Sequence, residues 1–329
     1  MTPDPNPLKP ARTRELITVL GNWELPEIHE VVPRFGAHVF RVSTVGSNLI
    51  LKDLGEKEPD VARLEFLCEV LEHVDASGLA VSNPLRTRDG QPCFRSGGRT
   101  YQVYRQIDAD PYPQDPVERK SLFSDVGQSI AQLHESLAAY RDPGLSERTW
   151  REDHVPAYDG WVERLTRDLS GTERSVVSEV ARVRGAETKL RMARPGEQLI
   201  HRDLHPGNVL VRQNRVVGFI DCDHLSIGQS VFDLAYYAAN LLKAQVDDAE
   251  RPLPWLEEAS ALVSGYREQR PFSEDEMEAF PHALLCYHLL LATWFLTMDQ
   301  EDAMHREIRC LRWLHVNFDS ARNIAFGAD

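Results

Sequence analysis

The segment HRDLHPGNVL, residues 201–210, restricts the local fold more than any other part of this chain. Its adjacent Pro206 and Gly207 interrupt a regular helix, because proline lacks a backbone N–H and glycine loses much conformational entropy when ordered. The segment therefore predicts a loop. Such a loop can turn the side chains of Asp203 and Asn208 toward one cleft.

A β-hairpin is predicted directly after this loop. The apolar runs 209–211 and 216–220 flank the polar turn 212–215, which is the pattern of two short strands joined by a turn. Such a hairpin brings Asp221 back beside the loop.

The order of these side chains matches the needs of phosphoryl transfer. An ionised Asp203 can orient or accept the proton of a substrate hydroxyl. Asn208 and Asp221 offer amide and carboxylate oxygens, which Mg²⁺ binds together with waters and substrate phosphates. Asp223 is either a ligand for a second Mg²⁺ or a solvated loop acid.

The histidines of this segment raise a different possibility, a transition-metal site. His201 and His205 have the spacing of a helical zinc pair, but no glutamate of an HExxH motif lies between them and Pro206 follows at once. We therefore expect His201 to be buried and to brace the loop. His205 is expected to contact phosphate or metal-bound water, or simply to pack.

The motif HRDLHPGNVL followed by GFIDCDH resembles the aminoglycoside phosphotransferase family, kinase-like enzymes that phosphorylate small molecules. Protein kinases usually have a lysine at the position of His205 and a DFG triplet at the position of 221–223. The segments 125–137 and 226–242 are also similar to the family. The resemblance implies that Asp233 lies in a helix behind the loop and braces it.

The resemblance extends to nucleotide binding. LILKDLG, residues 49–55, is similar to the family strand whose lysine holds the α- and β-phosphates, which assigns this role to Lys52. Glu65 is implied as its ion-pair partner, with Glu69 one turn away on the same helix face. Gly36 lies where protein kinases have a glycine-rich loop over the phosphates.

Adenine contacts are implied at the link between the two parts of such a fold. Backbone groups near Val103, Tyr104 and Gln106 are the candidates. Ala109 departs here from the glycine that family members often have.

The predicted fold is α+β, bilobal and protein-kinase-like, with a nucleotide-binding lobe at 1–105 and a catalytic, acceptor-binding lobe at 106–329. The first lobe is expected to be an antiparallel sheet with one helix, and the second to be mostly helical. First-lobe strands are predicted at 28–32, 37–44, 48–53, 92–95 and 100–105, with the helix at 59–74. Second-lobe helices are predicted at 117–139, 157–168, 172–190, 230–244, 254–268 and 274–298.

Cysteine usage and apolar runs bear on location. The five cysteines are scattered without a CxxC pair, which suits a reducing cytoplasm. The polar N-terminal residues 1–16 contain no apolar signal core, so we expect a cytoplasmic protein. The apolar run 284–298 is too short and too interrupted for a membrane span, and predicts a buried helix instead.

The net charge of −14 is unevenly distributed. Residues 1–107 carry 13 Lys and Arg against 14 Asp and Glu, whereas residues 108–329 carry 24 against 37. An acidic second lobe disfavours nucleic acid as a partner and favours a cationic acceptor, although acidic surfaces also serve solubility.

These features together predict an Mg²⁺-requiring phosphotransferase that uses ATP or GTP and phosphorylates a hydroxyl of a small molecule. An aminoglycoside or another amine-bearing natural product is one acceptor class, which would make the protein an antibiotic-resistance enzyme. A metabolic kinase of the homoserine or choline type and a non-catalytic nucleotide-binding regulator stay open as alternatives. A protein kinase is disfavoured, because only 12 residues separate Asp221 from Asp233 and leave no room for a long activation segment.

Overall fold

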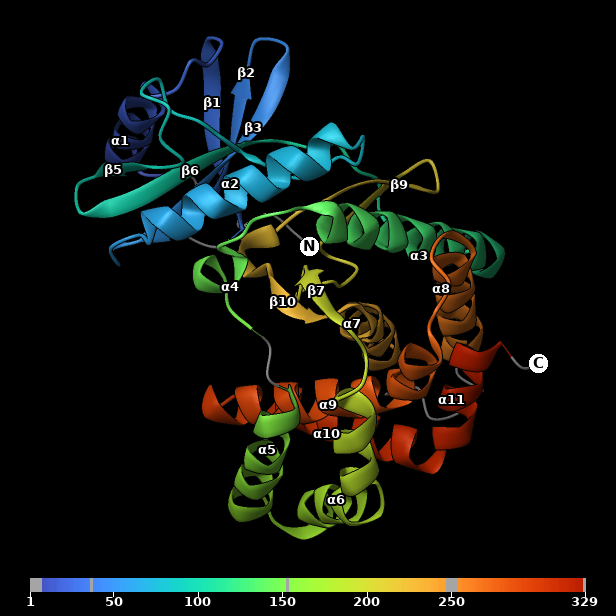
Figure 1. Cartoon of the computed structure of the whole chain (residues 1–329). Helices are drawn as coiled ribbons and strands as arrows, with labels where there is room; N and C mark the ends of the chain where they lie inside the picture. The colour runs from blue at the N-terminus through green and yellow to red at the C-terminus, as the bar shows by residue number, and fades with distance from the viewer. Residues whose placement is uncertain (1–7, 36–37, 152–153, 247–253, 328–329) are drawn as a thin grey trace. The chain divides into compact units, whose positions relative to one another are not determined.

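The computed structural model describes residues 8–35, 38–151, 154–246 and 254–327 (Figure 1). The chain forms two compact units. The first contains the described residues up to Asp108 together with Gly218–Asp223. The second contains Ala109–Val217 and the described residues from His224 onward.

An antiparallel sheet forms the centre of the first unit, with the strand order β1-β2-β3-β6-β4 and β5 also paired with β6. Its strands are β1 (Ile28–Phe35), β2 (Val39–Thr44), β3 (Ser47–Gly55), β4 (Pro84–Leu85), β5 (Phe94–Ser96) and β6 (Arg99–Arg105). Burial alternates along β2, as expected for a strand with one face on a core. The link from β2 to β3 is two residues long, and Gly46 there has a φ of 82°, which suits glycine.

Two helices accompany this sheet, α1 (Pro10–Leu20) and α2 (Val61–Ala76). Helix α1 is absent from the predictions; its Leu16, Val19 and Leu20 pack into one cluster with buried residues of β1, β2, β3 and β6. Helix α2 was predicted, and it begins where the Asp60 carboxylate accepts the backbone N–H of Arg63 at 3.0 Å.

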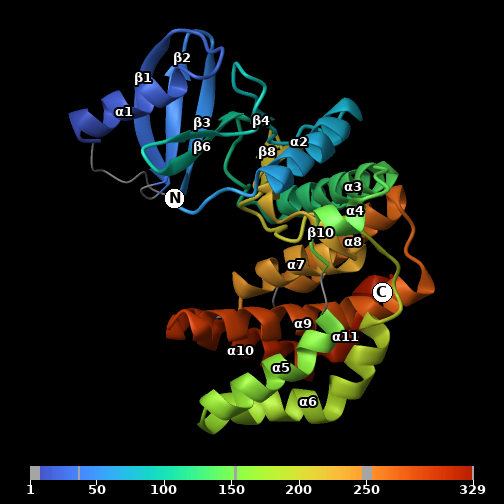
Figure 2. The same cartoon turned by 60° about the vertical axis from the view of Figure 1, so that its left-hand side comes forward.

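The second unit is mostly helical, as predicted. Its helices are α3 (Pro116–Ala139), α4 (Leu145–Arg148), α5 (His154–Asp168), α6 (Gly171–Met192), α7 (Ser230–Lys243), α8 (Trp255–Gln269), α9 (Glu274–Thr297), α10 (Glu301–Val316) and α11 (Phe318–Phe326). Helices α4, α10 and α11 were not predicted. Helix α9 packs against α10, and α5 packs against α6, as Figures 1 and 2 both show.

Helix α9 is the one described helix that is long and apolar enough to cross a membrane by length and composition. Two thirds of that stretch, 67%, is buried inside the structure, so α9 is a core helix of the second unit. It begins with a capping box in which Ser273 and Glu276 satisfy each other's backbone N–H groups. The prediction of a buried helix here is confirmed.

Helices α3 and α8 cross closely because each has a glycine at the contact. A Cβ atom on Gly127 would lie 1.9 Å from the carbonyl oxygen of Leu262, and one on Gly265 would lie 2.0 Å from that of Ser124. Any larger residue at either position would force the two helices apart.

Candidate active site

The loop 201–208 is anchored from behind by the carboxylate of Asp233, which is fully buried on α7. Oδ2 accepts the backbone N–H of His201 and Oδ1 accepts that of Arg202, both at 2.7 Å. Arg202 has a φ of 71°, a strained conformation that these hydrogen bonds help to hold. Asp233 thus braces the loop, as the resemblance implies.

His134 continues this support into the core. Its Nε2 donates to Oδ2 of Asp233 at 3.1 Å, and its Nδ1 lies 2.8 Å from the hydroxyl of Tyr266 on α8. All three side chains are buried. The catalytic loop is therefore tied to α3, α7 and α8 through one chain of buried polar contacts.

Asp203 is held at both carboxylate oxygens. The hydroxyl of Tyr236 donates to Oδ1 at 2.7 Å, and Nδ2 of Asn208 donates to Oδ2 at 3.0 Å and to the Asp203 backbone carbonyl at 2.8 Å. Burial and the nearby negative charge of Asp203 raise the pKa of Tyr236, so its hydroxyl stays protonated and remains a donor. The structure brings Asp203 and Asn208 together, as expected from the loop.

The two histidines of the loop have separate partners. His201 is fully buried and its Nδ1 accepts the backbone N–H of Asp203 at 3.3 Å, so its predicted burial is confirmed. Nδ1 of His205 accepts the backbone N–H of Gly207 at 3.0 Å. Among the residues that the structure describes, no three or more His, Cys, Asp or Glu side chains are arranged to hold a metal ion.

The predicted hairpin follows the loop as β8 (Val209–Arg212) and β9 (Arg215–Phe219). The end of β9 belongs to the first unit, where Phe219 exchanges backbone hydrogen bonds with Ala80 and Ser82 at 3.0 and 2.8 Å. Gly218 permits this approach, since a Cβ atom there would lie 3.0 Å from the Ala80 carbonyl oxygen. The hairpin thereby delivers Asp221 to the first unit.

Lys52 forms a cluster with two carboxylates of the first unit. Its Nζ lies 2.7 Å from Oδ1 of Asp221 and 3.2 Å from Oδ2 of Asp223. Burial alone would lower the pKa of Lys52, but attraction to Asp223 and Asp221 outweighs it and raises that pKa. Asp221 has a φ of 62°, so its backbone is left-handed, as is that of Arg202 in the loop 201–208.

Glu65 has a different partner from the predicted one. Its carboxylate pairs with Nη1 of Arg86 at 2.8 Å, and Arg86 also contacts Glu72 at 3.2 Å. Lys52 is instead paired with Asp221 and Asp223. The predicted Lys52–Glu65 ion pair is therefore absent from this structure, because Arg86, just after β4, reaches the same face of α2.

The residues proposed for adenine contacts lie at the end of β6. Val103 pairs with Leu51 and Leu85, and Tyr104 pairs with Ile50 and Pro84, so both peptide units lie inside the sheet. The backbone N–H of Gln106 donates to the Asn48 carbonyl at 3.0 Å. Gly36, the proposed phosphate-loop glycine, lies outside the described residues.

Comparison with known proteins identifies the family. A model of the phosphotransferase enzyme family (APH) matches residues 29–284, well over half of the chain. This chain belongs to that family. A homoserine kinase of Azorhizobium caulinodans is 28% identical over 251 residues, which is 74% of this chain and 71% of the relative.

Two solved structures of kinases share the fold of this chain. A microcompartment-associated aminopropanol kinase has a TM-score of 0.70 at 15% identity, covering 94% of this chain and 98% of that one. An amicoumacin kinase in complex with AMP-PNP has a TM-score of 0.67 at 17% identity, covering 92% and 94%. The predicted kinase-like fold is confirmed, and the protein is a small-molecule kinase of the APH family.

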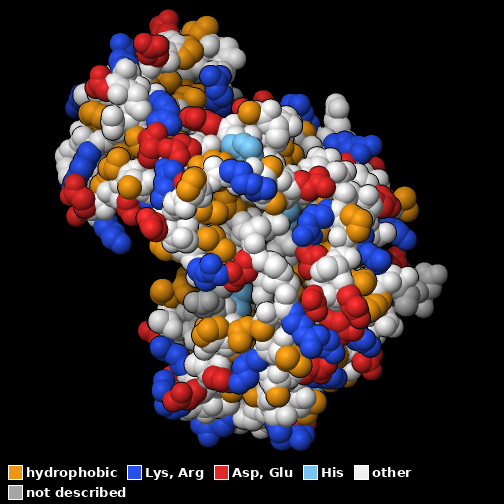
Figure 3. All heavy atoms as spheres, viewed as in Figure 1, with side chains coloured by type: hydrophobic (Ala, Val, Ile, Leu, Met, Phe, Trp, Pro, Cys, Tyr) orange, Lys and Arg blue, Asp and Glu red, His pale blue; other side chains and the backbone are white. Residues whose placement is uncertain are grey.

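The face shown in Figure 3 has no single continuous acidic patch. Acidic and basic side chains are interspersed on it. Several acids of the second unit are neutralised locally. Glu307 is fully buried and pairs with His288 at 2.6 Å and Lys243 at 3.1 Å, and Glu258 pairs with Arg119 at 2.6 Å. The net charge of −14 is thus weak support for a cationic acceptor.

Proposed function

We propose that this protein transfers the γ-phosphoryl group of ATP or GTP to a hydroxyl of a small amino alcohol. The observation that carries the proposal is the Asp203 carboxylate, oriented by Tyr236 and Asn208 on a loop that buried Asp233 braces. A positioned carboxylate at this place in an APH-family kinase is suited to act as the base for an acceptor hydroxyl.

In the proposed reaction the acceptor oxygen attacks the γ-phosphorus and the bond from that phosphorus to the β,γ-bridging oxygen breaks. The hydroxyl proton passes to Asp203, whose two oxygens keep lone pairs beyond those used by Tyr236 and Asn208. The fixed carboxylate reduces the entropy that must be lost in reaching the reactive geometry.

Asn208, Asp221 and Asp223 form the proposed Mg²⁺ ligand set. The donor atoms fit this ion: Asn208 uses its Nδ2 on Asp203, so its amide oxygen is the atom that can serve as a ligand, and both aspartates offer carboxylate oxygens. Bound Mg²⁺ neutralises charge on the phosphates. Lys52 is proposed to hold the nucleotide phosphates. When nucleotide binds, Lys52 gives up its contacts with Asp221 and Asp223 and pairs with the phosphates instead.

An amino alcohol is proposed as the acceptor because of the relatives. Several curated proteins that match are named homoserine kinases, and a solved structure with the same fold is an aminopropanol kinase. Homoserine is therefore the first candidate, and a larger amine-bearing natural product such as an aminoglycoside is the second. The cysteines, all in described parts of the chain, form no disulfide, which supports a proposed cytoplasmic location.

The test is a coupled nucleotide-turnover assay with Mg²⁺ and either ATP or GTP against homoserine, aminopropanol, choline and a set of aminoglycosides. We expect one amino alcohol to stimulate turnover. Asp203→Ala should lower kcat by about 10³-fold while nucleotide affinity is retained. Nucleotide binding without stimulation by any acceptor would favour a non-catalytic regulator, and unchanged turnover in Asp203→Ala would refute the assigned base.

A further inference from the structure

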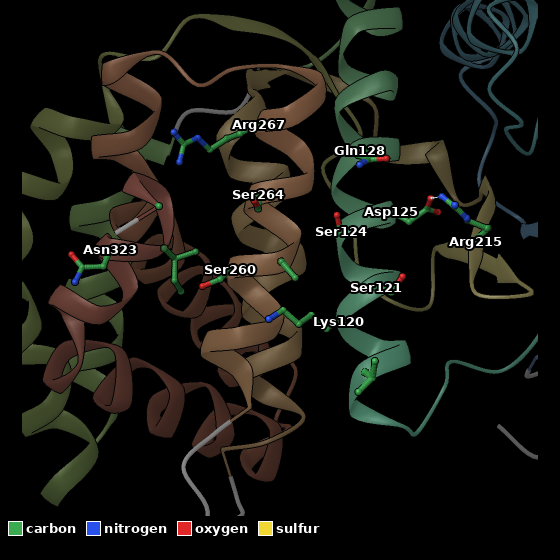
Figure 4. Close-up of a pocket in the computed structure, with 14 residues that line it drawn as sticks. Lys120, Ser121, Ser124, Asp125, Gln128, Arg215, Ser260, Ser264, Arg267 and Asn323 are labelled. Carbon is green, nitrogen blue, oxygen red and sulfur yellow. Dashed lines mark hydrogen bonds and ion pairs between the residues drawn. The ribbon is translucent and has the colours of Figure 1, made fainter. Parts of the chain in front are cut away.

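An open hollow of about 680 Å³ lies on the second unit, lined by α3, α8, α11 and the first residue of β9 (Figure 4). None of Asp203, Asn208 and Tyr236 lines it. Its volume is within the usual range for small-molecule sites, about 300–1,000 Å³. The side chains used below are Lys120, Ser121, Ser124, Ser260, Ser264 and Arg267.

The lining is basic although its surroundings are strongly acidic. Lys120, Arg215 and Arg267 line the hollow with one carboxylate, Asp125, which is paired with Arg215 at 2.6 Å. Among the residues that the structure describes, no carboxylate pairs with Lys120 or Arg267. In a lobe with 24 basic and 37 acidic residues, this local excess of positive charge favours an anion.

The remaining polar groups are mostly hydroxyls. Serines 121 and 124 lie on α3 and serines 260 and 264 on α8, and Figure 4 shows Lys120 extending from α3 toward α8. In the same view the Asp125–Arg215 pair lies on the other side of α3. Serine hydroxyls both donate and accept hydrogen bonds, so they suit a ligand that itself has hydroxyl groups.

We propose that this hollow is a second binding site, for an organic phosphate that carries hydroxyl groups, and that its occupancy stabilises the catalytic loop. Lys120 binds the phosphate and serines bind the hydroxyls, while Arg267, at the other end of the hollow in Figure 4 and hydrogen-bonded to the Ala325 carbonyl at 3.1 Å, adds positive charge. The site is separate from the one that performs phosphoryl transfer.

The route to the catalytic loop follows from the two helices that carry the site. Helix α3 holds Ser124 and, further along, His134; helix α8 holds Arg267 directly after Tyr266. His134 contacts both Tyr266 and Asp233, and Asp233 holds the loop backbone. A ligand that bridges α3 and α8 restricts their separation, and therefore stabilises the polar contacts on which the loop depends.

Binding is tested by calorimetric titration of the full chain with glucose 6-phosphate, in the absence of nucleotide, with glucose and inorganic phosphate as separate probes. We expect saturable binding of glucose 6-phosphate, weaker binding of phosphate and none of glucose. Lys120→Glu should weaken binding by about tenfold or more. Arg312→Glu, the same charge change at an exposed site on α10, should leave the affinity unchanged.

Coupling is tested by hydrogen exchange, which needs no knowledge of the acceptor and so is independent of the proposed reaction. Saturating glucose 6-phosphate should slow exchange of the His201 and Arg202 amides by about fivefold or more. Lys120→Glu should abolish the slowing. Equal affinity in Lys120→Glu and wild type would overturn the site, and binding without any change in loop exchange would overturn the coupling.

Discussion

The loop around Asp203 and the cluster around Lys52 are both held by charged groups, but they are built in different ways. The loop depends on Asp233 and His134, which are fully buried and hydrogen-bonded to groups that no ligand needs to displace. In the cluster, Lys52 is 21% exposed, and its partners Asp221 and Asp223 are 44% and 42% exposed. Those carboxylates are also the proposed metal ligands.

The loop is therefore a preorganised part of the site, whereas the Lys52 cluster is a part whose ion pairs can be exchanged for ligand contacts. Buried, satisfied polar networks are costly to disturb, so they fix the geometry of a base before substrate arrives. Half-exposed ion pairs contribute little to stability, so they can be replaced by phosphate and metal at small cost. The loop should therefore be sensitive to substitutions behind it, and the cluster should be sensitive mainly in its ligand affinity.

Of the substitutions behind the catalytic loop, Asp233→Asn is expected to have the largest effect. The amide has only one acceptor oxygen, so its NH₂ group opposes either the N–H of Arg202 at Oδ1 or the N–H groups of His201 and His134, which share Oδ2. We expect a loss of about 2–4 kcal/mol of unfolding free energy and about 100-fold in kcat. Denaturant titration and steady-state turnover measure these. Asp168→Asn, which alters an exposed ion pair with Arg167, is the control and should change neither.

Acid should destabilise the second unit before the first. Burial, with repulsion from Arg184 and Arg191, lowers the pKa of His282 from 6.5 to about 4. The stability of the fold with a neutral His282 ring is therefore fully present above pH 6.5, and about 3 kcal/mol of it is lost as the pH falls from 6.5 to about 4. In the first unit, Arg99 and Arg12 outweigh the effect of burial and lower the pKa of Asp53 below 3.8, so that stability is lost only at lower pH.

Hydrogen exchange followed separately in each unit between pH 7 and 4 measures this difference. His282→Asn, which retains a polar partner for Thr188, should reduce the pH dependence of the second unit, while the lowered pKa values of buried His154 and His288 continue to contribute to it. Simultaneous loss of protection in both units, or an unchanged slope in the variant, would contradict the assignment to His282.

Tyr236 and Tyr237 are neighbours on α7 and offer a matched pair. Tyr236 donates to Asp203, whereas the hydroxyl of Tyr237 lies 3.0 Å from that of Tyr112. Tyr236→Phe should lower kcat about tenfold with little change in nucleotide KM, because a hydrogen bond to a charged group is lost at the base. Tyr237→Phe should cost about 1 kcal/mol of stability and leave kcat unchanged. Equal kcat losses in both would show that Tyr236 acts only through packing.

The parts of the molecule that could be predicted are those set by local chemistry. The Pro206-Gly207 pair forces the loop, and the apolar runs on each side of a polar turn define the hairpin. Helices α3, α6 and α9 could be predicted because their apolar positions repeat at helical spacing. Helix α10 has the same signal in Met304, Ile308 and Leu311, so its omission was a missed pattern rather than a limit of the sequence.

The contacts that could not be predicted join residues far apart in the chain. Tyr236 lies in an apolar helix where a tyrosine is expected to belong to the core, and its hydroxyl meets Asp203, 33 residues earlier. His134 and Asp233 are 99 residues apart. The partner of Glu65 depended on whether Lys52 or Arg86 lay nearer in three dimensions, and helix periodicity alone does not determine this.

The smallest effect is expected from Glu65→Gln. Its ion pair with Arg86 is half-exposed, so the unfolding free energy should change by at most about 0.5 kcal/mol. Since Glu65 does not pair with Lys52, nucleotide KM should stay within about twofold of wild type, whereas Lys52→Ala should raise it about tenfold or more. Nucleotide KM and denaturant unfolding are measured for both variants.

Glu72→Gln is the control for Glu65→Gln, because Glu72 contacts the same Arg86 from the same helix. If the two variants behave alike, Glu65 has no role in nucleotide binding and only forms a surface ion pair on α2. A tenfold rise in nucleotide KM in Glu65→Gln alone would mean that Lys52 leaves Asp221 and Asp223 for Glu65 when nucleotide binds. The Lys52 cluster would then be the ligand-free arrangement, and the Lys52–Glu65 ion pair would form only when nucleotide binds. The cluster would then differ even more from the preorganised loop.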